Sequence, residues 1–79
     1  MTLLAYTTVC PEEEGSVAFQ FILRFRTNHH TAFVVHMHTM HDDAFHHGYY
    51  TNCLAQAIDN LKTRAEINKL EILDYGKNK

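Results

Sequence analysis

Two stretches of the chain alternate large apolar residues with smaller or more polar ones, which is the pattern of a β-strand with one buried face. The first stretch, residues 19–26, keeps its large apolar residues on one parity, at Phe19, Phe21, Leu23 and Phe25. The second stretch, residues 31–41, repeats the pattern at Phe33, Val35 and Met37. We therefore expect two strands, each with an apolar face and a mixed face.

The short polar segment between these stretches predicts how the strands pair. A three-residue connection, Asn28–His30, sets Phe25 opposite Phe33 and gathers the large apolar side chains on one face. A four-residue connection would set Arg24 opposite Phe33 and mix the two faces, so we reject it. The sequence predicts an antiparallel hairpin with three residues in its turn.

Two further strands are expected from composition. Leu3–Val9 is rich in β-branched and aromatic residues and stops before Pro11. Lys69–Tyr75 is a closing strand that ends at a glycine. Residues 42–50 follow neither period, and Gly48 breaks them, so an irregular connection is expected there.

One long helix is expected after this connection. Its apolar residues recur at the spacing of a single helical stripe, at Leu54, Ala57, Ile58, Leu61 and Ala65. Thr51 is the expected N-cap. A start as early as Asp43 stays open, and this choice decides where His46 and His47 point.

The element order β-β-β-α-β predicts an α+β fold in a single domain over residues 1–79. We expect a three-stranded antiparallel meander, a final strand parallel to the first after a right-handed crossover, and the helix on one sheet face. The other face is mixed in character and is a candidate dimer or partner surface. The expected interface residues are Ile22, Arg24, Arg26, Val34, His36, His38, Tyr49 and Tyr50.

Composition limits the function classes. A chain of 79 residues has a marginal core, so a homodimer or a bound partner is expected. The formal charge of −2 argues against a broad phosphate-binding surface, although protonation of all seven histidines would make the net charge positive. Arg24 and Arg26 beside His36 are few cations for nucleic acid, which we disfavour without a larger basic patch or an aromatic platform.

The expected compartment is the cytoplasm. Cys10 and Cys53 are too few and too far apart for a disulfide framework. The apolar start has no basic residue before it and runs directly into an acidic turn, so it is expected to be a strand and not a targeting peptide. The apolar stretch Val17–Leu23 is far shorter than the ~20 residues that cross a bilayer, so no membrane is implied.

The segments Ala18–Arg26 and Leu54–Leu61 resemble the second strand and the first helix of the ribonuclease H-like fold. The resemblance covers the N-terminal half of that fold and implies a sheet with one covering helix. The family's metal-binding carboxylates do not carry over, because Thr7 and Thr8 stand in the first strand and Asn52 or Cys53 at the helix. Two-metal phosphoryl chemistry is therefore disfavoured. Truncated, non-catalytic versions such as HicB-type antitoxins are the architectural analogy.

A histidine cluster is the strongest chemical lead. His36 and His38 are two apart on a strand, so both imidazoles point to one side at about 6–7 Å, which suits two ligands of one Zn²⁺ or another divalent transition metal such as Ni²⁺ or Cu²⁺. His41, Asp42 or His46 would complete the shell from the following loop. The alternative interpretation, which we favour, is that these histidines are polar surface or interface residues.

The sequence favours a small non-enzymatic regulatory or inhibitory protein that acts by binding a protein partner, and phage or mobile-element origin suits its size. A His-rich metal-binding protein or a minimal metal-dependent hydrolase that uses His36, His38 and His41 is the alternative. A nucleic-acid-binding module is a weaker one. Tyr49 and Tyr50 are expected either to pack onto the helix or to act as interface anchors.

Overall fold

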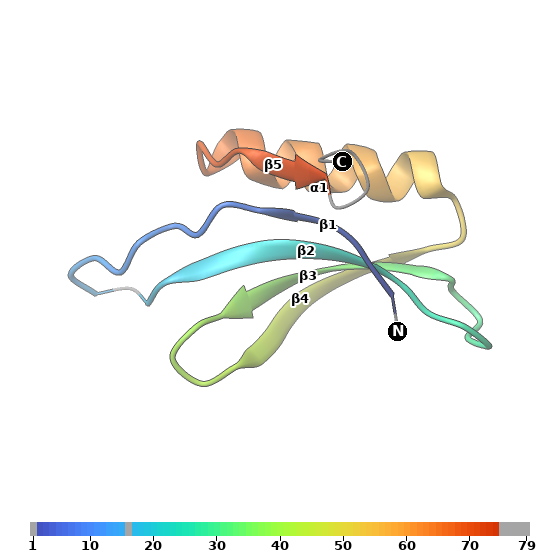
Figure 1. Cartoon of the computed structure of the whole chain (residues 1–79), viewed down its shortest axis with the longest axis horizontal. Helices are drawn as coiled ribbons and strands as arrows, with labels where there is room; N and C mark the ends of the chain where they lie inside the picture. Colours follow the sequence, from blue (N-terminus) through green and yellow to red (C-terminus); the bar gives the residue numbers. More distant parts are fainter. Residues whose placement is uncertain (1, 16, 75–79) are drawn as a thin grey trace.

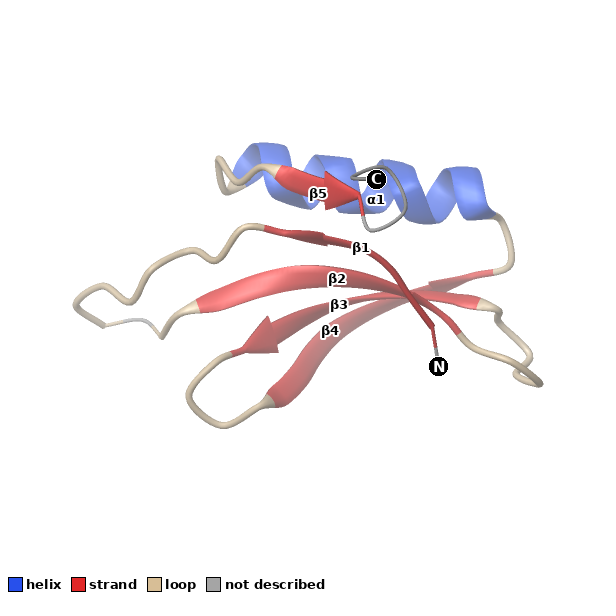
Figure 2. Cartoon of the chain, viewed as in Figure 1, coloured by secondary structure: helices blue, strands red, loops and turns tan. Residues whose placement is uncertain are grey.

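A five-stranded antiparallel sheet with one helix across one face forms the fold in a computed structural model, which describes residues 2–15 and 17–74 (Figures 1 and 2). The strand order is β4-β3-β2-β1-β5. Helix α1 (Leu54–Ile67) contacts β2, β3 and β4. The strands are β1 (Thr2–Thr7), β2 (Phe19–Phe25), β3 (Phe33–Thr39), β4 (Ala44–Thr51) and β5 (Ile72–Asp74). The expected α+β class, with one helix on one sheet face, is confirmed.

The predicted hairpin register is confirmed. Phe25 pairs with Phe33, and the same register sets Phe21 opposite Met37. Asn28 in the connecting turn has a φ of 63°, a left-handed conformation that asparagine tolerates better than most residues. The alternation of apolar residues along the two strands was sufficient to specify the register, because a shift by one position would send every apolar side chain to the other face.

The expectation of an irregular connection at residues 42–50 was wrong, because Ala44–Thr51 forms β4, which pairs with β3. The pairing shifts register between Val35 and Met37, where His36 alone faces the two residues His47 and Gly48. This β-bulge adds one residue to β4 and reverses the parity of its side chains partway along. A strand with reversed parity does not show a period of two, which explains why the sequence pattern did not reveal it.

The direction of the last strand was also predicted wrongly. β5 pairs antiparallel with β1, with Thr7 opposite Ile72 and Ala5 opposite Asp74. The extra strand β4 reverses the chain once more before α1, so the chain enters the helix from the opposite end of the sheet and leaves it running against β1. The strand begins later than the expected Lys69, because Lys69 has a φ of 58° in the turn after α1. The expected end at Tyr75 lies outside the described residues.

Helix α1 contributes a narrow buried stripe. Ala57, Leu61 and Ala65 are buried, and Ala57 and Leu61 pack with the β2 and β3 core residues Phe21, Leu23 and Val35. The N-cap is Cys53 and not Thr51, and it makes no side-chain capping bond. The Thr51 hydroxyl instead accepts the Cys53 N–H at 3.1 Å and donates to Gln56 Oε1 at 2.9 Å. Within residues 2–15 and 17–74, no helix has the length and apolar character to cross a bilayer.

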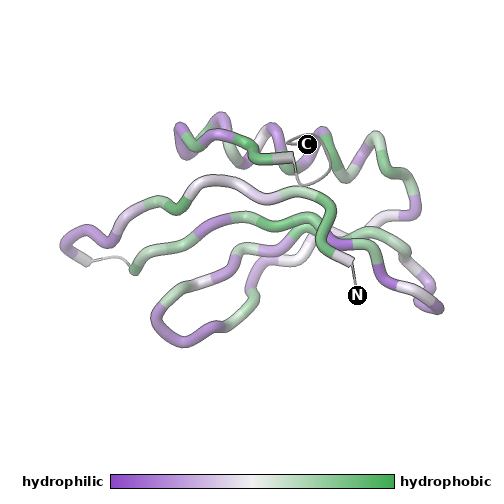
Figure 3. Tube along the Cα trace, viewed as in Figure 1, coloured by the Kyte–Doolittle hydropathy of each residue, from purple (hydrophilic) through white to green (hydrophobic). Residues whose placement is uncertain are grey.

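The hydropathy of the chain follows this architecture. Figure 3 shows hydrophobic residues along much of β2 and hydrophilic residues in the β1–β2 loop and the β3–β4 turn. Because α1 covers one face only, the residues of the opposite parity on β2 and β3 lie on a face without a helix among the described elements. That face, named the open face below, carries the candidate functional site.

Candidate binding surface

The open face combines buried aliphatic residues with larger polar and aromatic ones. Val34 has 0% and Ile22 has 7% of its surface exposed, although no helix covers them. Val34 lies between its cross-strand partners Arg24 and Tyr50. Large neighbours on both sides therefore shield a small apolar floor, and the residues that reach solvent stand above it.

One aromatic cluster on this face consists of four ring side chains, those of His36, His38, Phe45 and Tyr50. The His36 Nε2 atom lies 3.1 Å from the Tyr50 hydroxyl, and the two rings meet edge to face at 5.6 Å. Phe45 stacks on His38 with centroids 4.7 Å apart and lies 5.7 Å from the ring of His36. Phe45 is 41% exposed and Tyr50 is 48% exposed. The cluster thus presents half-exposed rings in fixed mutual orientations.

Two guanidinium groups lie over this cluster. Arg24 Cζ is 4.1 Å from the centroid of the Phe45 ring, and Arg26 Cζ is 4.9 Å from that of Tyr50. Both are cation–π contacts. Arg26 is further held by Nη2, which donates to the Thr31 carbonyl at 3.0 Å and to the Thr31 hydroxyl at 2.7 Å. The open face therefore carries two ordered positive charges.

The bulge in β4 builds this arrangement. Phe45 and Tyr50 are five positions apart, an odd spacing that would send them to opposite faces of a regular strand. The extra residue at His47 and Gly48 reverses the parity, so that Phe45 lies opposite His38 and Tyr50 opposite Val34. A Cβ atom on Gly48 would lie 2.7 Å from Tyr50 Cε1 and 2.8 Å from His36 Nε2. Glycine is needed here because the ring pair crosses directly over its backbone.

A shallow hollow of about 500 Å³ opens beside the cluster. Apolar atoms of β1 and β2 form much of its wall, and the Asp43 carboxylate in its lining lies 2.5 Å from His38 Nε2. Its lining residues are Leu3, Tyr6, Gln20, Ile22, Arg24, His38, Asp43 and Phe45.

The chemistry of His36 follows from its surroundings. Burial lowers the pKa of His36 below its usual 6.5, and the positive charges of Arg24, Arg26 and Arg64 lower it further. The ring is therefore neutral at pH 7, and it can share one hydrogen bond with the Tyr50 hydroxyl. Protonation would add a third charge beside the two arginines of the open face.

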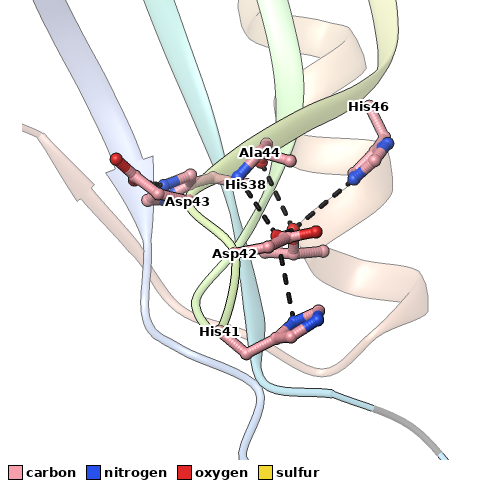
Figure 4. Close-up of polar contacts among 7 residues, drawn as sticks. His38, His41, Asp42, Asp43, Ala44 and His46 are labelled. Atoms are coloured by element: carbon pink, nitrogen blue, oxygen red, sulfur yellow. Dashed lines mark hydrogen bonds and ion pairs between the residues drawn. The ribbon is translucent and has the colours of Figure 1, made fainter.

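The structure does not gather the expected metal ligands. Figure 4 shows His38 paired with Asp43, whereas His41 Nδ1 lies 3.8 Å from Asp42. His46 pairs with Met37, on the face that α1 covers, and its Nε2 lies 3.5 Å from the Thr39 hydroxyl. No group of three or more His, Cys, Asp or Glu side chains that could hold a metal occurs in residues 2–15 and 17–74.

Asp42 organises the β3–β4 turn. Its carboxylate accepts hydrogen bonds from the Thr39 hydroxyl and, at 3.2 Å, from the backbone N–H of Ala44 (Figure 4). The bond from Thr39 is the main reason that the pKa of Asp42 is lowered. This carboxylate is thus bound into the turn that returns the chain to β4.

The expected interface residues separate into two groups. The open face brings together Ile22, Arg24, Arg26, Val34, His36, His38 and Tyr50. Tyr49 lies opposite Val35 and packs against the core, so it does not share that face. The expected interface did not include Phe45, which lies at the centre of the aromatic cluster. The bulge in β4 places Phe45 on the open face, and the alternation pattern did not predict β4.

Comparison with known proteins does not assign this chain to a family. No protein-family model, curated protein or solved structure matches this chain. The resemblance to a truncated ribonuclease H-like fold stays a prediction.

Proposed function

We propose that this protein is a small non-enzymatic binding protein, of regulatory or inhibitory kind, that docks a protein partner on its open face. The observation that carries the proposal is the pair of half-exposed rings, Phe45 and Tyr50, each with a guanidinium over it. Aromatic and arginine side chains are the residue types that dominate binding energy in protein interfaces.

Several of these side chains are held in place by their neighbours, which also supports the proposal. Ring stacking holds His38 and Phe45 together, and Thr31 holds Arg26. A partner that binds ordered side chains loses less conformational entropy than one that must first immobilise them. Docking on this face is therefore less costly than docking on flexible surface lysines.

The homodimer and the cytoplasmic compartment remain parts of the same proposal. The expectation of a dimer derives from the small core, and β4, which pairs only with β3 among the described strands, offers a sheet edge for it. Sedimentation equilibrium of the full chain measures the oligomeric state directly, and a monomer at micromolar concentration would contradict the dimer.

The docking experiment compares three forms of the immobilised full chain in extracts of the source cells. The forms are the unchanged protein, the open-face variant Arg24→Ala/Phe45→Ala, and the helix variant Leu54→Ala/Ile58→Ala, which removes exposed apolar surface elsewhere. Quantitative mass spectrometry should find the same captured proteins on the first and third forms and lose them on the second. Equal capture by all three forms would contradict the proposal.

A further inference from the structure

We infer that the partner segment recognised by the open face is acidic and inserts one large apolar side chain. The inference rests on the proposed function, because it names the chemistry of the segment that docks on that face. Two observations carry it, namely the apolar wall of the hollow and the two guanidinium groups that lie over the aromatic cluster.

The hollow selects the apolar part of the segment. Leu3, Ile22 and the ring of Phe45 contribute apolar wall to a space of about 500 Å³. A leucine, phenylalanine or tryptophan side chain from a partner would lose its contact with water there, which is a favourable transfer. The apolar lining around Ile22 therefore suits a large apolar anchor from the segment.

The two arginines favour acidic residues in the partner segment. A guanidinium beside a ring keeps its full positive charge, which attracts a carboxylate placed near it. Arg24 lies over Phe45 at the hollow, and Arg26 lies over Tyr50 further along the face. Acidic residues that follow the apolar anchor toward Arg24 and Arg26 would therefore lie near positive charge.

The same contacts argue against a nucleic acid as the ligand. Base stacking needs an uncovered ring face, whereas Phe45 carries the guanidinium of Arg24 and also stacks on His38. The face has two arginines, and Lys62 and Arg64 lie on α1. The chain as a whole carries a formal charge of −2, which opposes the approach of a polyanion. A short acidic segment of a protein fits two cations better than a phosphate backbone does.

Asp43 places a negative charge in the lining of the hollow. Its carboxylate lines the hollow beside His38 and would repel an acidic residue placed next to it. The acidic residues of the segment should therefore lie toward Arg24 and Arg26. Removal of the Asp43 charge should strengthen binding, whereas removal of the Arg24 charge should weaken it.

The experiment selects ligands without assuming their sequence. A displayed library of random twelve-residue peptides is selected on the immobilised full chain, and enriched peptides are synthesised with a fluorescent label. Their affinities are measured by fluorescence anisotropy for the unchanged protein, for Arg24→Gln, for Asp43→Asn, and for Lys62→Gln, a charge-matched control on α1. Circular dichroism and urea unfolding of each variant verify its fold, and a labelled twelve-nucleotide oligo-dT is titrated in parallel.

Enriched peptides should carry Asp or Glu around a Phe, Leu or Trp. Arg24→Gln should weaken their binding by up to about tenfold, because the lost positive charge no longer attracts their carboxylates. Asp43→Asn should strengthen binding by a few-fold, and Lys62→Gln should leave it unchanged. Replacement of the peptide's acidic residues by their amides should weaken binding to the unchanged protein, which keeps the test valid even if a protein variant fails to fold.

Other outcomes would overturn the inference in distinguishable ways. Peptides without acidic enrichment whose binding still needs Arg24 would overturn the inference and leave the proposed function standing. Peptides that bind the open-face variants as well as the unchanged protein would contradict the proposed function itself. Tighter, Arg24-dependent binding of oligo-dT would assign the face to nucleic acid, and failure to enrich any peptide would also reject the inference.

Discussion

His36 and Tyr50 meet on the open face, with the imidazole Nε2 of one 3.1 Å from the hydroxyl of the other. They come from β3 and β4 and are not direct cross-strand partners, since Tyr50 lies opposite Val34. The contact exists because the bulge brings Tyr50 back over the backbone of Gly48. The local shape of β4 thereby determines how the rings of the open face are arranged.

Gly48→Ala should displace the His36–Tyr50 pair. The added Cβ would approach atoms of both rings within 3 Å, so one ring must move and the hydrogen bond is lost. We expect the free energy of unfolding to fall by about 1 kcal/mol, the usual net value of one such bond, as measured by urea unfolding. The decrease in the free energy of unfolding should be smaller when Gly48→Ala is made in the Tyr50→Ala protein. Equal costs in both backgrounds would mean that the ring pair is not the cause.

The stability of the fold should fall as the pH decreases through 6.5. The pKa of His36 is lowered in the folded protein, mainly by burial and then by Arg24, Arg26 and Arg64. Near pH 6.5 the unfolded chain therefore binds more protons at this residue than the folded chain, so the free energy of unfolding rises with pH there. The contribution is present above pH 6.5 and is lost below the lowered pKa. Urea unfolding between pH 7.5 and about 5 measures it.

The control for this pH dependence is a pair of variants. His36→Gln removes the titrating ring and keeps a polar group near Tyr50, so the slope between pH 7.5 and about 5 should flatten. His30→Gln removes an exposed imidazole from the β2–β3 turn and should keep the slope. A slope that is unchanged in His36→Gln protein would assign the pH dependence to other groups.

Thr7→Val should destabilise the protein markedly. Thr7 is fully buried, and its hydroxyl accepts the backbone N–H of Phe21 at 2.9 Å where the β1–β2 ladder ends. Valine has the same shape but leaves this N–H without a partner, which costs about 1–3 kcal/mol. Thr8→Val is the matched control, because Thr8 Oγ1 accepts the Glu71 N–H at an exposed position. Thermal or urea unfolding should show a clearly larger loss for Thr7, and equal losses would refute the buried-acceptor argument.

Zinc should not bind as a stoichiometric structural ion. Three histidines of the expected cluster are engaged separately, with His36 on Tyr50, His38 on Asp43 and His46 near Thr39. A shared zinc site would require these contacts to break and His46 to leave the face that α1 covers. Native mass spectrometry of untagged protein, followed by calorimetric titration with zinc chloride, measures binding. One tightly bound zinc that His38→Ala releases would revive the metal hypothesis.

The sequence alone determined the parts of this protein that repeat with a regular period. The alternation along residues 19–26 and 31–41 specified the β2–β3 register, because a shift of one residue would have exposed Phe21 and Phe25. The helical spacing of Ala57, Leu61 and Ala65 located α1. These patterns are visible in one dimension because each buried face recurs at a constant interval.

The tertiary structure alone decided the features that break a period or depend on chain direction. The bulge at Gly48 hides β4 from pattern analysis and brings Phe45 and Tyr50 to one face despite their odd spacing. The additional strand then reverses the chain and makes β5 antiparallel to β1. An inserted residue changes every later side-chain direction, and it is stabilised by contacts with β3 that are remote in sequence. For that physical reason the composition of the open face was decided by the fold and not by local pattern.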